Sequence, residues 1–529
     1  MKVLSLHSLG HDAGVSYFED GALRYSIEAE RLSRVKHDGR VDDALRHVLR
    51  EASIDPTQID LIAVSTPFSH RLLGLGDLDG ALTAVDSGAL HHRTTSTLLG
   101  RPVDCVVVTH EVSHAALAAH YAGHSEGCVV LVNEGRGQIT RSSLFRVEHG
   151  RLNWLEKDPL PWYGNGFGWS ALGYLFGFGK SPSVAGKVMA LGGYGRPRAD
   201  VRELLLGVRG DVMADPAAAQ ATYDDLSGRP QFARDFQTMA DVIATFQELF
   251  TERVFELLAR HTGVPAEVDV ALGGGCALNI VANAELRARL GRPIAIPPAC
   301  GDSGHSIGAG VYALRYVLGQ EVAPFSVYAL GQPEKADDSA AALAAAGLRP
   351  VPYDPGAAAR VLARGGVIAF LEGAGETGPR ALGHRSLLGD PTAEGMRKRL
   401  SEDLKRREWF RPLGAVIRDD RFAELFPGQE LSPYMLFNYD VREGLFPEAR
   451  HIDGTSRLQT LTGADHPRLY HLLGEFEQMT GVAALINTSL NGPGRAIAQT
   501  SRHMIDDFGG QDIDLFVADD VMAYGVGSR

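Results

Sequence analysis

Cysteine is scarce in this chain of 529 residues, which contains four, at positions 105, 128, 276 and 300. No two of them form a Cys-x-x-Cys pair, so there is neither a zinc-ribbon signal nor a disulfide framework, and a reduced cytoplasmic setting is expected. Long apolar runs are absent too. No stretch reaches the ~18 apolar residues of a membrane span, and the short apolar run before His7 is not a secretory signal, so no membrane partner is expected.

Positive charge is in deficit, since 52 Lys and Arg residues face 65 Asp and Glu residues, a net charge of −13. Nucleic acid is therefore not an expected partner, because its phosphates attract a basic surface. The sequence also lacks the Gly-x-x-x-x-Gly-Lys-Ser/Thr loop and the Gly-x-Gly-x-x-Gly fingerprint of two common nucleotide-binding folds. A hydrophobic share of 44% predicts folded domains, roughly two to four at this length.

Strand-like and helical runs recur in the same order in two parts of the chain. The first part predicts a three-strand meander, a helix and a further strand, at 2–7, 13–18, 22–30, 41–52 and 61–66. The second predicts a strand, a hairpin, a long helix and a strand, at 128–133, 142–157, 238–262 and 268–279. This repetition indicates an internal duplication.

A stretch rich in Gly, Pro and charge at 331–339 is typical of a linker. Beyond it, predicted helices and strands alternate to the end of the chain. We therefore place a domain boundary at 335–345, between the duplicated part and a second α/β domain.

Glycine is abundant, at 61 residues, and three glycine-rich loops follow predicted strands: EGRGQ (134–138), GGGCALN (273–279) and GDSGHSIGAG (301–310). Backbone N–H groups at a strand-to-helix turn form an anion site, and glycine allows a phosphate to approach closely. Three such loops favour nucleotide or phosphate binding, with ordinary tight turns as the alternative.

Histidine pairs form a second pattern. His110 and His114 are spaced i, i+4, which places two imidazoles on one helix face, as a metal site requires. A carboxylate from a distant loop, such as Asp302, would supply a third ligand. Two other pairs, at 7 and 11 and at 120 and 124, have the same spacing. Exposed or capping histidines are the alternative interpretation of any one pair.

A basic cluster marks the second domain: Arg380, Arg385, Lys405, Arg406, Arg407 and Arg411. Arg clamps phosphate or carboxylate through two hydrogen bonds, and Lys binds as a point charge. Ser489 and Asn491 point to the same side of a predicted strand and can hold a small planar group such as an amide. For Lys405–Arg407, a solvated charged helix is the alternative.

Ten motifs occur in one order over nearly the whole chain: HDA (11–13), EAERLSRVKHD (28–38), HEVSHAA (110–116), AGKVMAL (185–191), GGGCALN, GDSGHSIGA, GETGPRALGHRSLLGDP (375–391), KRREWFRP (405–412), DGTSRLQT (453–460) and NTSLN (487–491). In this order the sequence resembles the O-carbamoyltransferase family of the NodU/CmcH type, which includes the aminoglycoside and ansamycin carbamoyltransferases. The resemblance implies an α/β fold with a duplicated actin-like (ASKHA) domain at 1–335 and a YrdC-like α/β domain at 345–529.

The resemblance also implies a two-step activity. The C-terminal domain would form carbamoyl adenylate and pyrophosphate from carbamoyl phosphate and ATP. The N-terminal domain would then transfer the carbamoyl group to a hydroxyl of a small natural product, beside a metal that acts as a Lewis acid. Because carbamoyl adenylate hydrolyses in water, we expect it to pass between the domains through a closed channel.

By motif, the resemblance assigns residues to each role. The metal, iron(II) or zinc, would be held by His110, His114 and Asp302. Carbamoyl phosphate and ATP, with Mg²⁺, would be held by Arg380, Lys405, Arg411, Arg457, Asn487, Ser489 and Asn491. Nucleotide contacts of the first domain would come from Lys36, Glu134 and Ser306. His11 and Asp12 would lie at the acceptor, with His11 as the base for its hydroxyl.

Several positions depart from the family pattern. The family usually has Asp at 134, Glu at 138, Arg at 374, Phe-Ala-Pro at 413–415 and Glu at 495, where this chain has Glu134, Gln138, Ala374, Leu-Gly-Ala and Arg495. These departures motivate an alternative, a nucleotide-binding scaffold without catalysis. A further alternative is carbamoyl transfer to protein or tRNA, against which stand the negative charge and the missing Cys-x-x-Cys pairs. Residues 74–92 are a candidate lid or homodimer interface.

Overall fold

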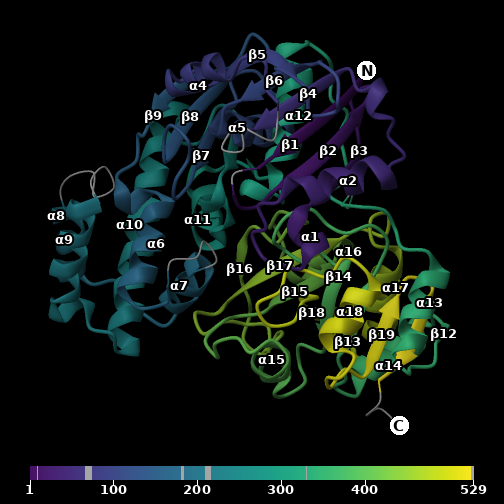
Figure 1. Cartoon of the computed structure of the whole chain (residues 1–529). Coiled ribbons are helices and arrows are strands. Elements are labelled where there is room, and N and C mark those ends of the chain that lie inside the picture. Colours follow the sequence, from purple (N-terminus) through teal and green to yellow (C-terminus); the bar gives the residue numbers. More distant parts are fainter. Residues whose placement is uncertain (9, 66–73, 180–183, 209–215, 329, 526–529) are drawn as a thin grey trace. The chain divides into compact units, whose positions relative to one another are not determined.

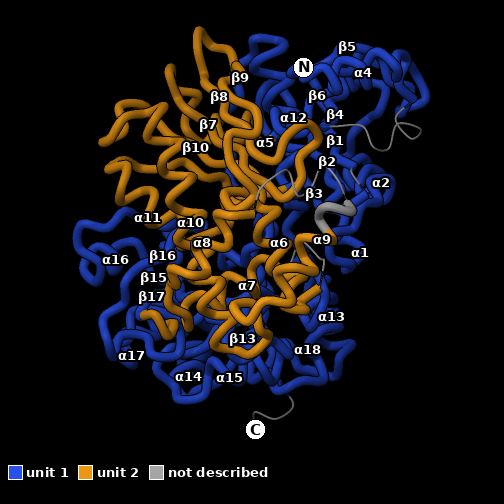
Figure 2. Tube along the Cα trace, turned by 90° about the vertical axis from the view of Figure 1, so that its left-hand side faces the viewer, with its two compact units in different colours: residues 1–113, 302–450, 454–529 blue, residues 114–301, 451–453 orange. Residues whose placement is uncertain are grey.

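The structure is a computed structural model that describes residues 1–8, 10–65, 74–179, 184–208, 216–328 and 330–525 (Figure 1). It divides into two compact units, coloured blue and orange in Figure 2. Unit 1 consists of residues 1–113, 302–450 and 454–529, and unit 2 of residues 114–301 and 451–453. Among the described residues, no helix combines the length and the apolar composition needed to cross a bilayer.

The first sheet of unit 1 has six strands in the order β3-β2-β1-β4-β6-β5. Its strands are β1 (Lys2–His7), β2 (Gly14–Glu19), β3 (Ala22–Glu28), β4 (Leu61–Ser65), β5 (His91–Ser96) and β6 (Val103–Val108). The first three are antiparallel, and β1, β4 and β6 run parallel. This arrangement confirms the meander and the following strand predicted from the sequence.

Helices cover both faces of this sheet. The apolar side of α2 (Val41–Glu51) packs on inward-facing side chains such as Leu4, Leu6 and Val64. On the other face lies α12 (His305–Tyr312), which packs on β1, β2 and β4. A Cβ at Gly310 would lie 2.2 Å from the Phe18 ring, so glycine is what lets α12 come this close to the strands. The unit also has α1 (Ala29–Ser33) and α4 (Leu78–Asp86).

The sheet of unit 2 has the order β11-β10-β7-β8-β9. Its strands are β7 (Val129–Asn133), β8 (Ser142–Glu148), β9 (Arg151–Lys157), β10 (Val270–Gly273) and β11 (Ile294–Ala295). An antiparallel meander followed by two parallel strands repeats the order of the first sheet from β3 to β6. The repeated topology confirms the duplication and the α/β fold class, with the strand arrangement expected of an actin-like domain.

Unit 2 also contains the helices α6 (Gly166–Leu175), α7 (Val184–Gly192), α8 (Ala199–Gly207), α9 (Pro216–Ser227), α10 (Phe236–Thr262) and α11 (Ile280–Leu290). Helix α10, expected at 238–262, begins where the Asp235 side chain accepts from the N–H of Thr238. Helix α5 (His110–Tyr121) crosses the division, which falls between Ser113 and His114.

Unit 1 also contains a nine-stranded sheet in the order β12-β20-β19-β13-β14-β18-β15-β17-β16. Its strands are β12 (Val351–Pro352), β13 (Ile368–Leu371), β14 (Arg385–Gly389), β15 (Gly414–Arg418), β16 (Asn438–Asp440), β17 (Thr455–Leu461), β18 (Ala484–Ser489), β19 (Leu515–Ala518) and β20 (Val521–Tyr524). Side chains alternate between two apolar cores. Ile368 and Phe370 of β13 enter one core, and Ala369 and Leu371 the other.

One core lies under α14 (Pro355–Ala363) and α17 (Pro467–Thr480). The other lies under α13 (Ala336–Ala345), α16 (Asp419–Leu425) and α18 (Ser501–Phe508), and the short α15 (Met396–Lys398) is on the same side. This three-layer arrangement is the second α/β part that the sequence predicted.

The linker prediction for 331–339 is wrong in its second half, because α13 begins at Ala336. Asp337 and Asp338 lie in the first turn, where carboxylates are stabilised by the helix dipole. The charged residues on which the linker prediction relied therefore mark the start of a helix. The expected domain boundary at 335–345 lies inside unit 1, and the division into domains at 1–335 and 345–529 stays a prediction.

Candidate active site

Helices α5 and α12 bring three polar side chains of unit 1 together. A short 3₁₀ turn, Asp302–Gly304, leads directly into α12, so the glycine loop carries both Asp302 and His305. Asp302 Oδ1 lies 3.8 Å from His110 Nε2 and 3.5 Å from His305 Nε2. Both histidines are buried, with side chains 3% and 0% exposed. The turn thus aims a carboxylate at two imidazoles that have little access to water.

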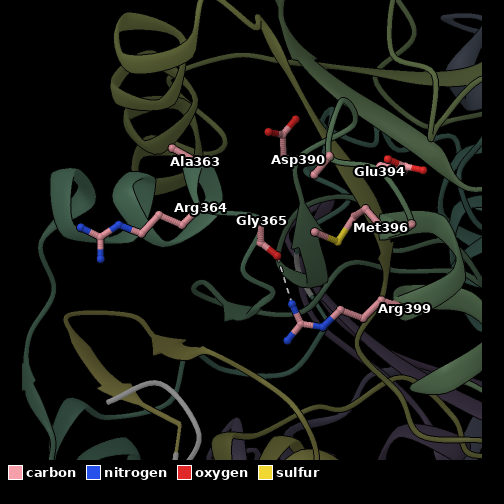
Figure 3. Close-up of a pocket in the computed structure, with 9 residues that line it drawn as sticks. Ala363, Arg364, Gly365, Asp390, Glu394, Met396 and Arg399 are labelled. Carbon is pink, nitrogen blue, oxygen red and sulfur yellow. Dashed lines mark hydrogen bonds between the residues drawn. The ribbon is translucent and has the colours of Figure 1, made fainter.

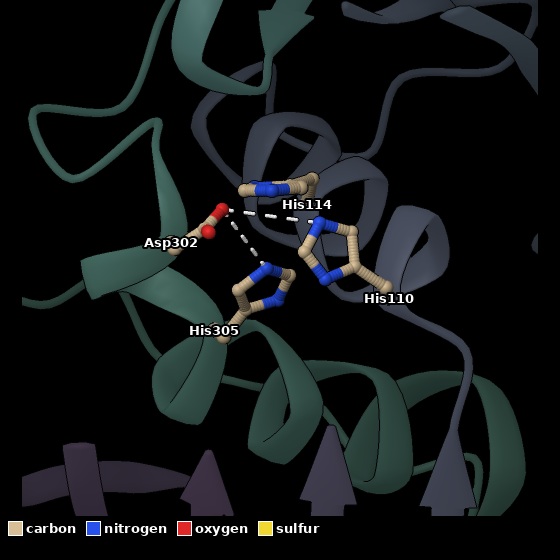
Figure 4. Close-up of side chains that lie close together, drawn as sticks. All are labelled: His110, His114, Asp302 and His305. Atoms are coloured by element: carbon tan, nitrogen blue, oxygen red, sulfur yellow. Dashed lines mark ion pairs between the residues drawn. The ribbon is translucent and has the colours of Figure 1, made fainter. Parts of the chain in front are cut away.

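His114 follows His110 by one turn of the same helix, as the i, i+4 spacing predicted. One ligand atom from each of His110, His114, Asp302 and His305 can be chosen so that all four lie within 4.8 Å of one another (Figure 4). Imidazole nitrogens and a carboxylate oxygen are the donors that iron(II) and zinc accept. The donor set fits a transition metal, and it contains one histidine that the sequence patterns did not single out.

The ring of His7 packs against His305 and His110. It stacks on the ring of His305 with centroids 4.2 Å apart, and neither of its ring nitrogens has a hydrogen-bond partner among the described residues. Complete burial lowers the pKa of His7 to about 3, so the ring is neutral at ordinary pH. The pairing of His7 with His11 that the spacing suggested is not a shared ligand face, because β1 ends at His7.

His11 and Asp12 form the second predicted group. His11 Nδ1 lies 3.0 Å from Asp12 Oδ2 and 3.4 Å from Asp302 Oδ2. The other oxygen of Asp12 lies 2.9 Å from Nδ1 of His37, a residue of the motif at 28–38 to which the sequence analysis assigned no role. Burial alone would raise the pKa of Asp12, but hydrogen bonds from His11 and His37 outweigh it and lower that pKa. One carboxylate therefore orients two imidazoles, one of them beside the metal-ligand group.

The three predicted nucleotide contacts of the first domain each have different neighbours. Glu134 Oε1 is 2.7 Å from His114 Nε2, within unit 2, so this carboxylate lies at a predicted metal ligand. The Ser306 hydroxyl is buried and lies 2.8 Å from that of Ser16. Lys36 is exposed and close enough to the basic cluster that its charge lowers the pKa of Lys405.

The basic cluster assembles around the end of β18. Lys405 Nζ donates to Ser489 Oγ at 2.8 Å, to Asn491 Oδ1 at 2.7 Å and to the carbonyl oxygen of Ser489. Lys405 is 3% exposed, and its segment forms a turn after a short π-helix. The alternative of a solvated charged helix at Lys405–Arg407 is therefore wrong. Ser489 and Asn491 act as acceptors for the ammonium group, which fixes its position.

Two arginines, Arg407 and Arg411, lie close to this lysine, and Arg380 and Arg457 lie close to Arg407. Burial, followed by the charges of Arg411 and Arg380, lowers the pKa of Arg407 to about 9. Burial lowers the pKa of Lys405 and Arg457 well below their usual values, and neighbouring cations add to both effects. Positive charge is thus concentrated where little water stabilises it, which is the electrostatic condition for binding an anion.

Two residues near the cluster use their side chains for hydrogen bonds within the protein. Asn487 is fully buried and donates to Gln459 Oε1 at 2.8 Å. Arg385 is fully buried and donates to the carbonyl oxygens of residues 372, 373, 384 and 499 at 2.9–3.0 Å. The interpretation of Arg385 as a phosphate clamp is wrong, because its guanidinium is used by the backbone.

The departure at Arg495 is accommodated by an ion pair. Arg495 Nη1 lies 2.9 Å from Asp507 Oδ1, and Arg34 binds the other oxygen of Asp507. The backbones of Val35 and Arg495 form a β-bridge. Arg495 and Arg34 thus share one carboxylate, so the three groups together carry one net positive charge.

A pocket of about 560 Å³ in unit 1 lies elsewhere (Figure 3). Arg399 donates to the carbonyl oxygen of Gly365 at 3.0 Å and pairs with Asp514 at 2.9 Å. Among the described residues that line this pocket, none is a predicted site residue, and one of its two arginines, Arg399, is already paired. The pocket is therefore separate from the predicted site.

Comparison with known proteins supports the resemblance. The families "Carbamoyltransferase N-terminus" and "Carbamoyltransferase C-terminus" match residues 2–67 with 95–311, and 359–524. Nodulation protein U of Bradyrhizobium diazoefficiens is 30% identical over 536 residues, which cover 92% of this chain and 91% of that protein. The 3′-hydroxymethylcephem-O-carbamoyltransferase of Streptomyces clavuligerus is 30% identical over 503 residues, 91% of each chain. This chain therefore belongs to the carbamoyltransferase family.

Proposed function

We propose that this carbamoyltransferase is an ATP-dependent O-carbamoyltransferase of a small natural product. In a first step, carbamoyl phosphate and ATP react with water to give carbamoyl adenylate, phosphate and pyrophosphate at the basic cluster. In a second step, the carbamoyl group moves from adenylate to an acceptor hydroxyl beside the histidines of α5 and α12, and AMP leaves.

The convergence of Lys405, Arg407, Arg411 and Arg457 with Arg380 carries the proposal. Buried cations that lower one another's pKa destabilise the protein until an anion binds to them, so their clustering indicates an anion-binding site. Two phosphorylated substrates bring several negative charges to one another, and fixed cations offset their repulsion. Lys405 is held by Ser489 and Asn491, so its ammonium is positioned before substrate arrives.

The second step depends on the His11 and Asp12 pair. When Asp12 Oδ2 accepts from His11 Nδ1–H, the imidazole tautomer has its lone pair on Nε2, which can take the proton of the acceptor hydroxyl. Asp302 contacts both His11 and the metal-ligand histidines, so the base and the metal group share one carboxylate. A metal bound there supplies a Lewis acid for charge that develops on the carbamoyl oxygen.

Pyrophosphate release from ATP, measured with and without carbamoyl phosphate, tests the first step. We expect carbamoyl-phosphate-dependent release and carbamoyl adenylate in the mass spectrum. Lys405→Ala should abolish release, whereas its exposed neighbour Arg406→Ala should leave it unchanged. His110→Ala should keep release and lose transfer to a hydroxylated acceptor. Absence of release from the metal-loaded protein at saturating substrates would contradict the proposal and favour a nucleotide-binding scaffold.

A further inference from the structure

We propose that His305 is a further protein ligand of the metal in the proposed transfer site, so that the metal serving this site takes more than four ligands. The inference rests on the proposed function, from which it takes the existence of that metal. It adds a ligand from α12 to the set of His110, His114 and Asp302, and it restricts which ions leave room for substrate.

The distances between the ligand atoms fit binding to one shared metal ion. Asp302 Oδ1 lies 3.5 Å from His305 Nε2 and 3.8 Å from His110 Nε2. Both distances exceed the roughly 2.7–3.2 Å of an N–H···O hydrogen bond. Ligand atoms bound to one ion at about 2.0–2.1 Å lie roughly 3.4 Å apart when they are tetrahedral neighbours. The three atoms of unit 1 thus have the spacing of co-ligands more than that of a hydrogen-bonded cluster.

The orientation of the His305 ring also fits a metal ligand. Its Nδ1 lies 3.1 Å from Ser65 Oγ, at the end of β4, and both residues are completely buried. A ligating histidine commonly donates its other ring N–H to such a partner, which fixes the tautomer and directs the lone pair at the metal. The ring is packed against His7 and His110, with centroids 4.2 and 4.1 Å away. His305 therefore presents Nε2 to Asp302.

The number of protein ligands limits which metal ions leave a position open for substrate. A catalytic zinc site keeps three protein ligands and one open position, whereas four protein ligands close a tetrahedral site. With three imidazoles and one carboxylate, an ion limited to four ligands has no position for a carbamoyl oxygen. An ion with five or six positions, such as iron(II), has one or two. The donor set consequently favours such an ion for catalysis.

Cobalt(II) alone is the probe, added to metal-free full-length protein and followed by calorimetry and visible absorption. We expect one ion per chain and the weak visible bands of five- or six-coordinate cobalt. His305→Gln and His110→Gln should each weaken binding at least about 100-fold, and X-ray absorption of the loaded protein should show one imidazole fewer. His124→Gln, on the turn that follows α5, is the matched control and should bind like the native chain.

The outcomes separate this inference from the function on which it rests. Cobalt affinity within threefold of native and an unchanged imidazole count in His305→Gln, together with loss of binding in His110→Gln, would overturn His305 as a ligand and leave the metal site standing. Intense four-coordinate bands in the native protein would overturn the coordination number. A native chain that binds no cobalt would overturn the metal site and this inference with it. Should His305→Gln melt early, Ser65→Ala keeps the ring and should weaken binding by 10–100-fold.

Discussion

The guanidinium of Arg31 donates a hydrogen bond of 2.7 Å to the carbonyl oxygen of Gly378, far along the chain but within the same compact unit. Arg31 also donates to the carbonyl oxygen of Glu376 and pairs with Glu28, whose Oε1 accepts from the N–H of Gly378. The buried pair thus fastens the first helix to the loop that carries Arg380. Loop and helix are expected to respond together when either is changed.

Replacing Arg31 by Met should destabilise unit 1 by about 3–5 kcal/mol at pH 8.5, because a buried carboxylate loses its cation. Burial already raises the pKa of Glu28 to about 7. Without Arg31 that pKa rises further above its unfolded value, so stability is present at low pH and is lost as pH rises through the folded pKa. Urea unfolding should therefore show a smaller penalty at pH 5.5. Equal penalties at both pH values would contradict this, and Glu28→Gln with Arg31→Met should remove the pH dependence.

Binding of carbamoyl phosphate should take up protons. Lys405 and Arg407 have lowered pKa values, the latter about 9, and a bound anion stabilises their charged forms and raises both. Protons are then taken up at any pH between the pKa of the free protein and that of the anion-bound protein. The affinity for carbamoyl phosphate falls as pH rises through the pKa of the free protein. Calorimetry at pH 8.5 in buffers of different ionisation enthalpy measures this uptake. Lys405→Met should reduce the uptake, and uptake equal to that of the native chain would rule out the lysine as its source.

Gly414→Ala should disturb the position of Arg457. A Cβ at this position would lie 2.9 Å from the carbonyl oxygen of Arg457 and 3.4 Å from Met435. Since the first of these is backbone, β17 would have to shift, at a cost of about 1–3 kcal/mol. We expect the KM for carbamoyl phosphate to rise several-fold in the pyrophosphate assay. Gly510→Ala, at which no atom of the described residues lies within 4 Å of the added Cβ, is the control, and equal behaviour of the two variants would contradict the crowding argument.

The pair of His37 and Asp12 should make stability depend on pH near neutrality. The hydrogen bond to Asp12 raises the pKa of His37, so its contribution is complete below the ordinary value of about 6.5 and disappears as pH rises through the folded value. His37→Gln should therefore lower the melting temperature more at pH 6 than at pH 9. A difference from the native chain that is constant between these pH values would show that the pair does not titrate there.

Local patterns predicted what depends on nearby residues. Alternating apolar runs fixed both meanders, and the i, i+4 spacing placed His110 and His114 on one turn of α5. They could not predict what depends on burial or on distant contacts. Arg385 has the guanidinium group that a phosphate clamp needs, but the backbone carbonyl groups that it binds instead can be identified only in the structure. His305 and His37 belong to no recognised spacing, because their partners lie on other elements. Lys36 was assigned to the nucleotide by motif, and its closeness to Lys405 emerges only from the fold.

The composition of unit 1 from three chain segments has a consequence for synthesis on the ribosome. Strands β1 to β6 emerge first, but α12, which covers one face of their sheet, follows only after residues 114–301. Unit 2 comes almost entirely from one uninterrupted segment and can begin to fold as it emerges. We therefore expect the face of the amino-terminal sheet that α12 covers to stay uncovered while unit 2 is being made, and we expect chaperones to bind the nascent chain in this interval.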